Sequence, residues 1–592
     1  MSYITSVGTG TWSTATTWSG GVVPVSGDTV TVSHTVTVTS IETVGDSPTS
    51  NTTALDTTAT GKIVINPGAS LTVRGDLNCL GPGTSHWTAL TLEGGGQLWM
   101  DNSQSASSVK YLIRLGRSAN QRVGLETRGS VSSICTIGSV AGGSPSFFSR
   151  NGIGGTQYYR CSYTDFLRIG DNASTCLYLY LNQSSSEATF DHCVFDNCGQ
   201  FEMNTITGSG ATLSVAYSIW TNTAATQCMK ILWSAGTIRN VEENSFDTQV
   251  TIQGGSGGTI QRNFFARTIA ASGSASYDFS ANMVRQTVAT TGHATHASVF
   301  SNYYLSHTAT GNCHMISPTN SAGGDVYIQG NIFEYTGTPS NGDMVLGLTG
   351  LAAGTNYRVN RNLVIPNGAG DSSGAINFNG GSNATLFAEY NTFMAGGSGG
   401  IYVGETYGRA NLVLSVRGNL MWDTSARGYK IWRETSNILQ DIVSGGSVDF
   451  NSGWSFATGT DLKGYQGSAA THLCSVAPGA NDLNVNPNFV DSSRNITTWA
   501  ASLGLASSST SGVEAIFNRY GRSGANASAT PQNLYDYVAN GFRPTNTSLR
   551  SASHESLTIG AFEGVFAGAS ALYPIPRIDG RRGGRVGTLH VR

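Results

Sequence analysis

One short motif recurs through the middle of this chain and constrains its fold more than any other feature. The motif is an asparagine followed two positions later by a bulky apolar residue, as in Asn263-Phe-Phe265. Successive copies are 19, 19, 20, 29, 31, 29 and 28 residues apart. The eight copies begin at Asn244, Asn263, Asn282, Asn302, Asn331, Asn362, Asn391 and Asn419. Self-similarity at this period is typical of stacked repeats, in which each repeat buries its apolar face against its neighbours.

The residues before each motif favour a β-strand. DVYIQ precedes Asn331 and TLFAEY precedes Asn391, and both alternate between apolar and polar residues. Alternation with period two marks strands with one buried face, and Gly/Ser clusters such as residues 254–258 mark turns. We therefore predict an all-β fold, a right-handed parallel β-helix whose coils lie about 4.8 Å apart. A propeller is the main rival, but its blades need about 40 residues each.

The asparagine has a structural role in such a fold. A tight bend often needs a left-handed backbone, which asparagine tolerates, and its amide can hydrogen-bond to the same amide one coil away. The apolar residue two positions on is expected to point inward and form a stack. The predicted stack is Phe246, Phe265, Val284, Tyr304, Phe333, Val364, Phe393 and Met421. Weaker upstream copies begin at Cys161, Cys193 and Ser218.

Composition agrees with a turn-rich β protein. The 592 residues include 75 Gly and only 12% charged residues. The net charge of −3 gives no electrostatic reason to expect nucleic acid or an anionic membrane as partner. The opening residues lack the features of a secretory signal, and no stretch reaches the length of a membrane span, so we expect synthesis in a cytoplasm. Nine cysteines without CxxC pairs predict buried free thiols rather than a disulfide framework or a zinc site.

The N-terminal part has its own pattern. Residues 11–38 carry Trp12 and Trp18 and a Val/Thr alternation, and this stretch resembles the opening of G8-type β-rich domains. We interpret the two tryptophans as a cap over the end of the solenoid, with a sugar platform as the alternative. Residues 63–73 and 90–100 superimpose with a step of 27, which places Ile65 on Leu92 and Leu71 on Leu98.

The C-terminal part resembles the closing segment of bacterial and phage β-helix proteins. The resemblance rests on residues 486–491 (NPNFVD) and 559–563 (IGAFE). Residues 505–556 are expected to hold an insertion or a small helix, with 511–522 as the best helical candidate. The predicted organisation is a cap over 1–60, coils over 61–430, terminal coils and a capping region over 431–564, and a basic tail over 565–592.

The resemblance as a whole is to pectate-lyase-like β-helices, especially phage virion proteins. Members that cleave polysaccharide place acids on the outward face of neighbouring coils, and a glycosidase needs two carboxyl groups roughly 5–9.5 Å apart. Acids stand in register two places before the motif start and three places after it, the latter including Glu334. The best cluster consists of Asp191, Asp196, Glu242, Glu243 and Asp247.

These acids have a simpler interpretation as groups that keep the solenoid hydrated and deter edge pairing. A lyase would add a base such as Arg262 or Arg285, but no dense calcium-binding set accompanies them. His293 and His296, with His307 and His314 nearby, lack the spacing of a metal site. We therefore predict no metal and no cofactor.

Three functions stay open. The leading one is a phage virion protein, a tailspike, fibre or surface-decorating β-helix that binds host glycan or neighbouring virion subunits; the family resemblance implies a homotrimer. The second is a polysaccharide-degrading enzyme, either a glycosidase or a lyase, and it could be a tailspike depolymerase. This function predicts that Asp196→Asn or Asp247→Asn abolishes polysaccharide cleavage. The third is a decoration protein without a glycan site.

The C-terminal residues form a basic tail. Arg577, Arg581, Arg582, Arg585 and Arg592 cluster in the last residues, and such a segment suits docking to another subunit. Deleting residues 577–592 should leave a folded protein that no longer incorporates into particles, as measured by particle purification and immunoblotting. Normal incorporation of the deletion variant would contradict the assembly role.

Overall fold

A computed structural model describes the strands and turns of most of the chain. The described residues are 2–25, 28–38, 53–57, 62–79, 87–101, 112–115, 123–141, 147–148, 157–170, 176–180, 186–205, 210–233, 237–254, 258–267, 269–272, 278–286, 292–293, 298–306, 317–318, 324–335, 346–349, 354–366, 376–379, 383–395, 401–403, 413–423, 447–454, 480–504, 529–553 and 555–562. The tail over 577–592 and the helical candidate 511–522 lie outside these residues.

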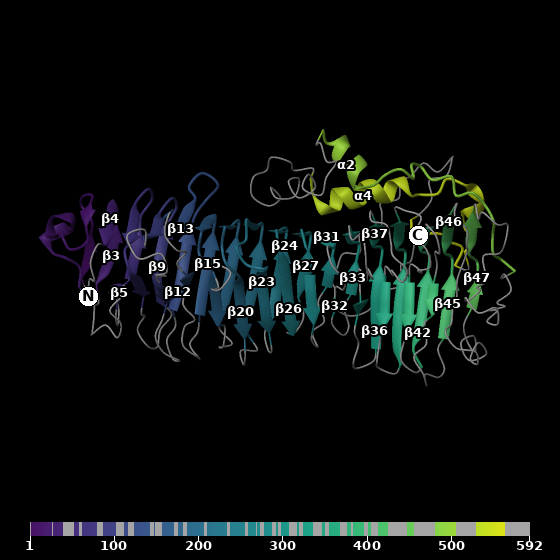
Figure 1. Ribbon diagram of the computed structural model, residues 1–592, viewed down its shortest axis with the longest axis horizontal. Coiled ribbons are helices and arrows are strands. Elements are labelled where there is room, and N and C mark those ends of the chain that lie inside the picture. The colour runs from purple at the N-terminus through teal and green to yellow at the C-terminus, as the bar shows by residue number, and fades with distance from the viewer. Residues whose placement is uncertain are drawn as a thin grey trace. The chain divides into compact units, whose positions relative to one another are not determined.

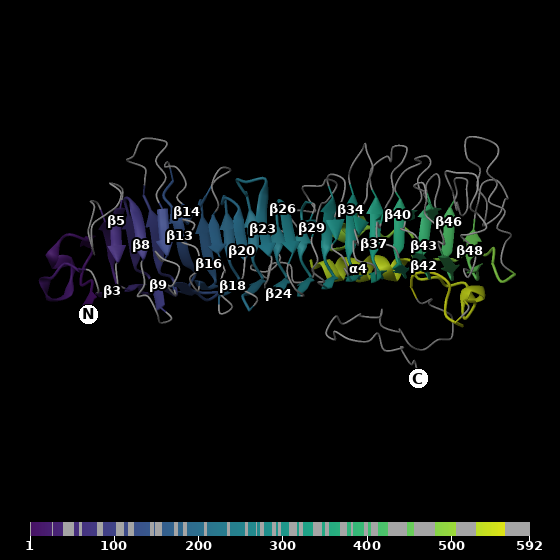
Figure 2. The same cartoon turned by 90° about the horizontal axis from the view of Figure 1, so that it is seen from below.

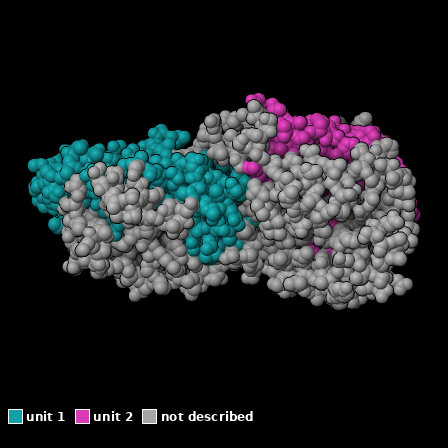
Figure 3. All heavy atoms as spheres, in the orientation of Figure 1, with its two compact units in different colours: residues 1–258, 264–269, 514–527 teal, residues 259–263, 270–513, 528–592 magenta. Residues whose placement is uncertain are grey.

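The chain divides into two compact units, coloured in Figure 3. Unit 1 comprises residues 1–258, 264–269 and 514–527, and unit 2 comprises 259–263, 270–513 and 528–592. In both units each strand pairs in parallel with its equivalent one coil later, so that the strands line up in long sheets (Figure 1). We call these the first, second and third sheets, in the order in which the chain visits them on each coil.

Unit 1 contains the early coils. Its first sheet consists of β1 (Tyr3–Thr5), β3 (Thr29–Val32), β6 (Lys62–Ile65), β9 (Trp87–Glu93), β12 (Val123–Arg128), β15 (Gln157–Ser162), β18 (Glu187–Asp191), β21 (Thr212–Ala216) and β24 (Thr237–Glu242). Its second sheet consists of β2 (Gly10–Thr11), β4 (Thr35–Val38), β7 (Ser70–Val73), β10 (Gln97–Met100), β13 (Cys135–Ser139), β16 (Thr164–Leu167), β19 (Val194–Asp196), β22 (Ile219–Thr221), β25 (Ser245–Phe246) and β28 (Phe264–Phe265). Its third-sheet strands are β5 (Thr53–Thr57), β8 (Asp76–Cys79), β11 (Leu112–Leu115), β14 (Phe147–Phe148), β17 (Leu177–Tyr180), β20 (Phe201–Thr205), β23 (Gln227–Trp233) and β26 (Gln249–Gly254).

Unit 2 repeats the arrangement. Its first sheet consists of β27 (Thr259–Gln261), β30 (Asp278–Ser280), β33 (Ser298–Phe300), β36 (Gly324–Gln329), β39 (Thr355–Asn360), β42 (Thr385–Glu389), β45 (Val413–Arg417) and β47 (Ser447–Asp449). Its second sheet consists of β31 (Met283–Gln286), β34 (Tyr303–Ser306), β37 (Ile332–Tyr335), β40 (Leu363–Pro366), β43 (Thr392–Ala395), β46 (Leu420–Asp423) and β48 (Ser452–Trp454). Its third-sheet strands are β32 (Gly292–His293), β35 (Ser317–Pro318), β38 (Leu346–Thr349), β41 (Ile376–Asn379) and β44 (Ile401–Val403), while β29 (Ile269–Ser272) spans the sequence boundary of the two units.

The pairings confirm the predicted parallel β-helix and exclude the propeller. Ile65 pairs with Leu92 and Leu71 pairs with Leu98, as the step of 27 residues predicts. All strand pairings in the described residues are parallel, apart from isolated antiparallel bridges, whereas propeller blades are antiparallel.

The N-terminal residues form coils rather than a separate layer. β1 and β3 join the first sheet, and β2 and β4 join the second, so the solenoid begins near residue 3. The chain then folds into η1 (Ala15–Thr17) and η2 (Ser19–Gly21). Trp12 and Trp18 pack edge to face with ring centroids 4.8 Å apart, and the Trp18 indole donates to the Trp12 carbonyl at 2.6 Å. Both indoles are buried, which suits a cap and excludes an exposed sugar platform.

The predicted asparagine ladder is present in unit 2. Each rung donates through Nδ2 to Oδ1 of the rung on the next coil, at 2.9–3.0 Å from Asn263 to Asn451. The same Oδ1 also accepts from the backbone N–H of the preceding rung. Every rung is buried, so these bonds satisfy polar groups that water cannot reach.

The left-handed bend lies one residue before the rung, so the prediction that the asparagine itself bends was wrong. In unit 2, Arg361 has φ of 57° and Tyr390 has φ of 57°, and each precedes a rung. Where the bend is a glycine, as at Gly330 (φ 67°) and Gly418 (φ 67°), the same geometry needs no strain. None of the ladder asparagines from Asn263 to Asn451 has a positive φ.

The structure differs from the predicted ladder at two places. The copy placed at Cys161 lies three residues too early, because Phe166 pairs with Phe195 and Thr164 takes the rung position. The ladder also continues beyond Asn419, to Asn451 and then Asp482, which accepts from the Asn451 backbone N–H at 2.8 Å. The sequence pattern missed this coil because Gly453 replaces the bulky apolar residue two places after Asn451.

The inward apolar stack is confirmed, since all eight predicted members are buried. Its aromatic part extends upstream, where successive rings lie 4.6–5.1 Å apart, close to the spacing of the coils. These upstream rings belong to Phe166, Phe195, Trp220, Phe246 and Phe265.

Within the described residues, two helices follow the last coil. α2 (Ile496–Ser502) begins with a capping box between Asn495 and Thr498, and α4 (Pro531–Gly541) begins at the Thr530 cap with proline at its first position. A single turn, η3 (Thr547–Leu549), comes later. Figures 1 and 2 show α4 lying across second-sheet strands near β37, and α4 contacts β34. α4 confirms the small helix expected within 505–556, whereas α2 was not predicted.

Breaking the ladder should destabilise the protein. Asn302 Oδ1 accepts from both nitrogens of Asn282, and its Nδ2 donates to Asn331 and to the Phe279 carbonyl. Asn302→Ala leaves buried donors without acceptors and should lower the free energy of unfolding by about 2–4 kcal/mol. Denaturant titration of Asn356→Ala, an outward asparagine of the first sheet, should show a loss of about 1 kcal/mol or less. Equal losses in the two variants would contradict a special role for the ladder.

Candidate functional site

The candidate site is the outward corner between the first and second sheets of unit 1. The chain turns this corner through one left-handed residue per coil: Tyr163 (φ 45°), His192 (φ 54°), Tyr217 (φ 51°) and Glu243 (φ 56°). Because the same bend recurs on successive coils, side chains at this position project outward one above the other. The corner therefore arranges residues from four coils in one row.

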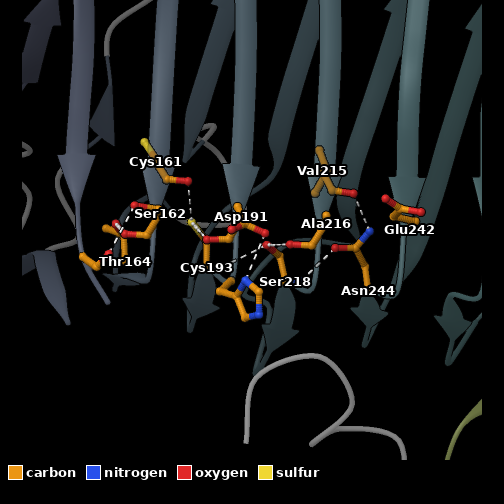
Figure 4. Close-up of polar contacts among 12 residues, drawn as sticks. Cys161, Ser162, Thr164, Asp191, Cys193, Val215, Ala216, Ser218, Glu242 and Asn244 are labelled. Atoms are coloured by element: carbon orange, nitrogen blue, oxygen red, sulfur yellow. Dashed lines mark hydrogen bonds and ion pairs between the residues drawn. The ribbon is translucent and has the colours of Figure 1, made fainter. Parts of the chain in front are cut away.

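Buried polar contacts fix the backbone beneath the corner (Figure 4). Asn244 Nδ2 donates to the Val215 carbonyl at 2.9 Å, and its Oδ1 accepts from the Ser218 backbone at 2.8 Å. Ser218 Oγ in turn donates to the Ala216 carbonyl at 2.9 Å and accepts from the Cys193 backbone at 3.1 Å. Ser218 is fully buried, so in unit 1 its hydroxyl satisfies buried polar groups at the position where unit 2 has an asparagine amide.

Three rings stack along the corner. The His192 imidazole lies 4.4 Å from the Tyr163 ring and 4.7 Å from the Tyr217 ring, with interplanar angles of 13° and 18°. These separations match the coil spacing, so the solenoid itself sets the stack. All three residues are half-buried. We call Tyr163, His192 and Tyr217 the corner column.

Two of the predicted acids flank the corner column in strand register. Asp191 pairs with Ala216, and Ala216 pairs with Glu242, so the carboxylates lie two coils apart with a methyl group between them (Figure 4). Two coil steps separate the backbones by about 10 Å, close to the carboxyl separation of roughly 6.5–9.5 Å in inverting glycosidases. The register that the sequence predicts for Asp191 and Glu242 is confirmed.

Hydrogen bonds orient both carboxylates. Asp191 Oδ1 lies 2.9 Å from His192 Nδ1, and the Asp191 side chain is 41% exposed. Glu242 accepts from Asn240 Nδ2 at 2.7 Å. Asp191 thus holds one ring nitrogen of His192 and orients the imidazole within the column. The arrangement offers two outward carboxylates, one imidazole and two phenols along four coils.

Asp196 and Asp247 lie at the other end of the second-sheet strands and tie coils together. Asp247 accepts from Thr223 Oγ1 at 2.6 Å and from the Thr223 backbone at 2.7 Å. Asp196 accepts from Asn222 Nδ2 at 2.8 Å. The five predicted acids therefore form two rows, one at the corner with Glu243 at the bend, and one of coil-bridging carboxylates.

The corner column was not predicted from the sequence. Its signal is an aromatic residue immediately before the rung on three successive coils. The shifted assignment at Cys161 hid this signal, because Tyr163 was then counted as an inward residue. Once Thr164 is the rung, Tyr163 takes the same place as His192 and Tyr217.

Other sequence hypotheses have less support from the structure. His293 lies in β32, whereas His296, His307 and His314 fall outside the described residues. Arg262 and Arg285 belong to unit 2, while the acids belong to unit 1. No group of three or more potential metal ligands occurs within the described ranges.

The cysteines whose surroundings the structure describes confirm the expected buried thiols. Cys135, Cys161, Cys176, Cys193, Cys198 and Cys228 are all buried and free. Burial raises the pKa of the Cys161 thiol well above its ordinary value, as expected for an unreactive thiol.

Comparisons with known proteins do not assign a family: no family model, no curated protein and no solved structure matches this chain. Across the part of the chain that the structure describes, every helix is too short or too polar to cross a membrane.

The two acid rows should respond differently to substitution. Asp247→Ala removes a carboxylate that binds two donors of Thr223 on the preceding coil, and it should lower the free energy of unfolding by about 1.5–3 kcal/mol. Asp191→Ala, at a more exposed position, should cost about 1 kcal/mol or less. Thermal and denaturant unfolding measure both. A larger loss in Asp191→Ala would contradict the division into structural and outward rows.

Proposed function

We propose that this protein binds polysaccharide along the corner column of unit 1. The observation that carries the proposal is the stack of Tyr163, His192 and Tyr217 beside the in-register carboxylates of Asp191 and Glu242. Carboxylates accept charge-assisted hydrogen bonds from sugar hydroxyls, and aromatic side chains combine apolar area with a polar end. A row with one residue per coil suits an extended polymer better than a compact ligand.

The proposed setting is a phage virion, in which the chain acts as a tailspike, fibre or surface-decorating subunit. Support comes from the resemblance of residues 486–491 and 559–563 to the closing segments of such proteins. The family resemblance also underlies the proposed homotrimer, and the basic tail is the proposed contact with other virion subunits. Host surface polysaccharide is the proposed ligand of the exposed corner.

A second candidate function is polysaccharide hydrolysis at the same corner. Its support is the separation of Asp191 and Glu242 by two coil steps, with only the Ala216 methyl group between them. One carboxyl group would protonate the departing oxygen while the other activates water, which inverts the anomeric carbon. Asp196 and Asp247 are less suited to this role, because Thr223 occupies both oxygens of Asp247.

Binding measurements on purified surface polysaccharides test the proposal. Asp191→Asn, His192→Ala and Glu242→Gln should each weaken binding by about tenfold or more, because each removes a charged or planar contact. Asp325→Asn, which changes an outward carboxylate of unit 2, is the matched control and should bind normally. Undiminished binding in all three corner variants would contradict the proposal.

The same proteins separate the two candidate functions. A hydrolase releases reducing ends from the polysaccharide, and both Asp191→Asn and Glu242→Gln should abolish that release. A binding protein leaves the polymer intact. The absence of binding to any polysaccharide would instead favour the decoration protein without a glycan site.

A further inference from the structure

The C-terminal segment of unit 2 lies along the outward face of the second sheet. Leu483 bridges to Ser452 on the last coil, and the chain then turns back over earlier coils. Contacts there join residues that are 162 and 169 positions apart in the sequence. Ile496 contacts Glu334, and the Ala561 backbone donates to Thr392 Oγ1 at 2.8 Å. We call the described residues from 484 to 562 the strap.

The strap covers residues that immediately follow the ladder asparagines. Tyr303, Ile332, Leu363, Thr392 and Leu420 point away from the solenoid interior, yet all are almost fully buried. Leu420 packs against Leu549 and Ile559 of the strap, and Trp422 lies 5.5 Å from the Phe489 ring. This face is therefore largely apolar where the strap lies.

One acid is enclosed in this contact. Glu334 is 3% exposed, and its register neighbours on β34 and β40 are Leu305 and Ile365. Its Oε2 accepts from the Ile496 backbone N–H at 3.1 Å, at the start of α2, and from the Tyr303 hydroxyl. Glu334 was expected on the outward surface with Asp196 and Asp247, but the strap buries it.

The surroundings of Glu334 contain few titratable groups. On β34 the facing group is the Tyr303 hydroxyl, and α2 carries no charged residue. Of the nearby strap residues, Arg494 binds Asp491 and the Tyr537 carbonyl. On α4, Asp536 accepts from Gln532. Glu334 is thus a buried carboxyl group that touches hydrogen-bond donors and, among the described residues, forms no ion pair.

Burial raises the pKa of Glu334 above the ordinary carboxyl value, although its two hydrogen bonds oppose the shift. A carboxyl group whose pKa is raised in the docked state binds its proton more tightly when the strap is closed. Closure is therefore fully favoured below the ordinary pKa of the released carboxyl group, and the advantage is lost as the pH rises through the raised pKa. When protonated, Oε2 can donate to the Tyr303 oxygen and still accept from Ile496.

We propose that Glu334 is a proton-operated latch for the strap: the protonated side chain holds α2 on the second sheet, and ionisation lets the strap lift and expose the apolar face beneath it. The device is independent of the corner column, which lies in unit 1. It rests on the enclosure of one carboxyl group, with no cationic partner in the described part of the chain, between a sheet and the segment that covers it.

The strap also contacts the second sheet away from Glu334, and these contacts are not expected to depend on the protonation of a buried acid. Tyr535 donates to the Gly330 carbonyl, and the Gly560 backbone donates to the Gly418 carbonyl at 2.9 Å. Neither contact involves an acid. The Tyr390 hydroxyl donates to Glu555 at 2.8 Å, but Glu555 is exposed and can stay hydrated when ionised. Among the strap contacts that the structure describes, only the one at Glu334 combines an acid with burial.

Hydrogen exchange measured by mass spectrometry from pH 4 to 9, corrected for intrinsic exchange, tests the latch on the full chain. In the wild-type protein the opening constant of α2 and α4 should rise by up to about tenfold per pH unit above the ordinary carboxyl pKa, then level off. Glu334→Gln, which is neutral at every pH, should keep the strap closed and remove the pH dependence. The matched control Glu555→Gln should retain the wild-type profile.

A second variant guards against loss of folding in Glu334→Gln. Tyr303→Phe removes a donor that favours the ionised carboxylate, so the levelling-off point should move to higher pH. The same pH profile in the wild-type protein and in either Glu334→Gln or Tyr303→Phe would overturn the latch. So would strap opening on acidification, or equal pH dependence in β36 and β39, which would mean that the whole unit loosens.

Discussion

The hydrogen bond between asparagine side chains on successive coils is the interaction on which the rest of this structure depends. An amide can donate along the stack and accept from the opposite direction, so one residue type satisfies the buried turn of every coil from Asn263 to Asn451. The ladder has a direction, because each rung donates through Nδ2 to Oδ1 of the next rung and never to that of the preceding one. The last rung is Asp482, whose carboxylate accepts from Asn451. A carboxylate has no hydrogen to donate, so the last rung does not need an acceptor on a further coil.

The ladder fixes the inside of each coil and leaves the outside free to differ. In unit 1 the bend residues before the rungs carry rings and an acid, and the coil spacing alone stacks them. In unit 2 the residues after the rungs are largely apolar and lie under the strap. The same repeat therefore supports a polar outward row in one unit and a covered apolar face in the other.

The repeated elements could be predicted from the sequence because their spacing is set by local chemistry. The ladder positions, the inward stack and the pairing of Ile65 with Leu92 all follow from periodicity. The rungs upstream of Asn244 were harder to place, since hydroxyl and thiol groups replace the amide and the pattern weakens. That weakness caused the three-residue shift at Cys161, and with it the failure to recognise Tyr163 and His192 as neighbours in the corner column.

The different surroundings of the acids show that the repeat register does not predict which side chains the rest of the chain buries. Asp196, Asp247 and Glu334 occupy the same place relative to the rung, and register alone makes them equivalent outward carboxylates. Asp196 and Asp247 bind donors on a neighbouring coil, whereas Glu334 is enclosed by residues more than 160 positions later in the chain. No periodicity records that contact, because the strap is not a repeat. Its burial turns an ordinary carboxyl group into one whose protonation depends on whether the strap is docked.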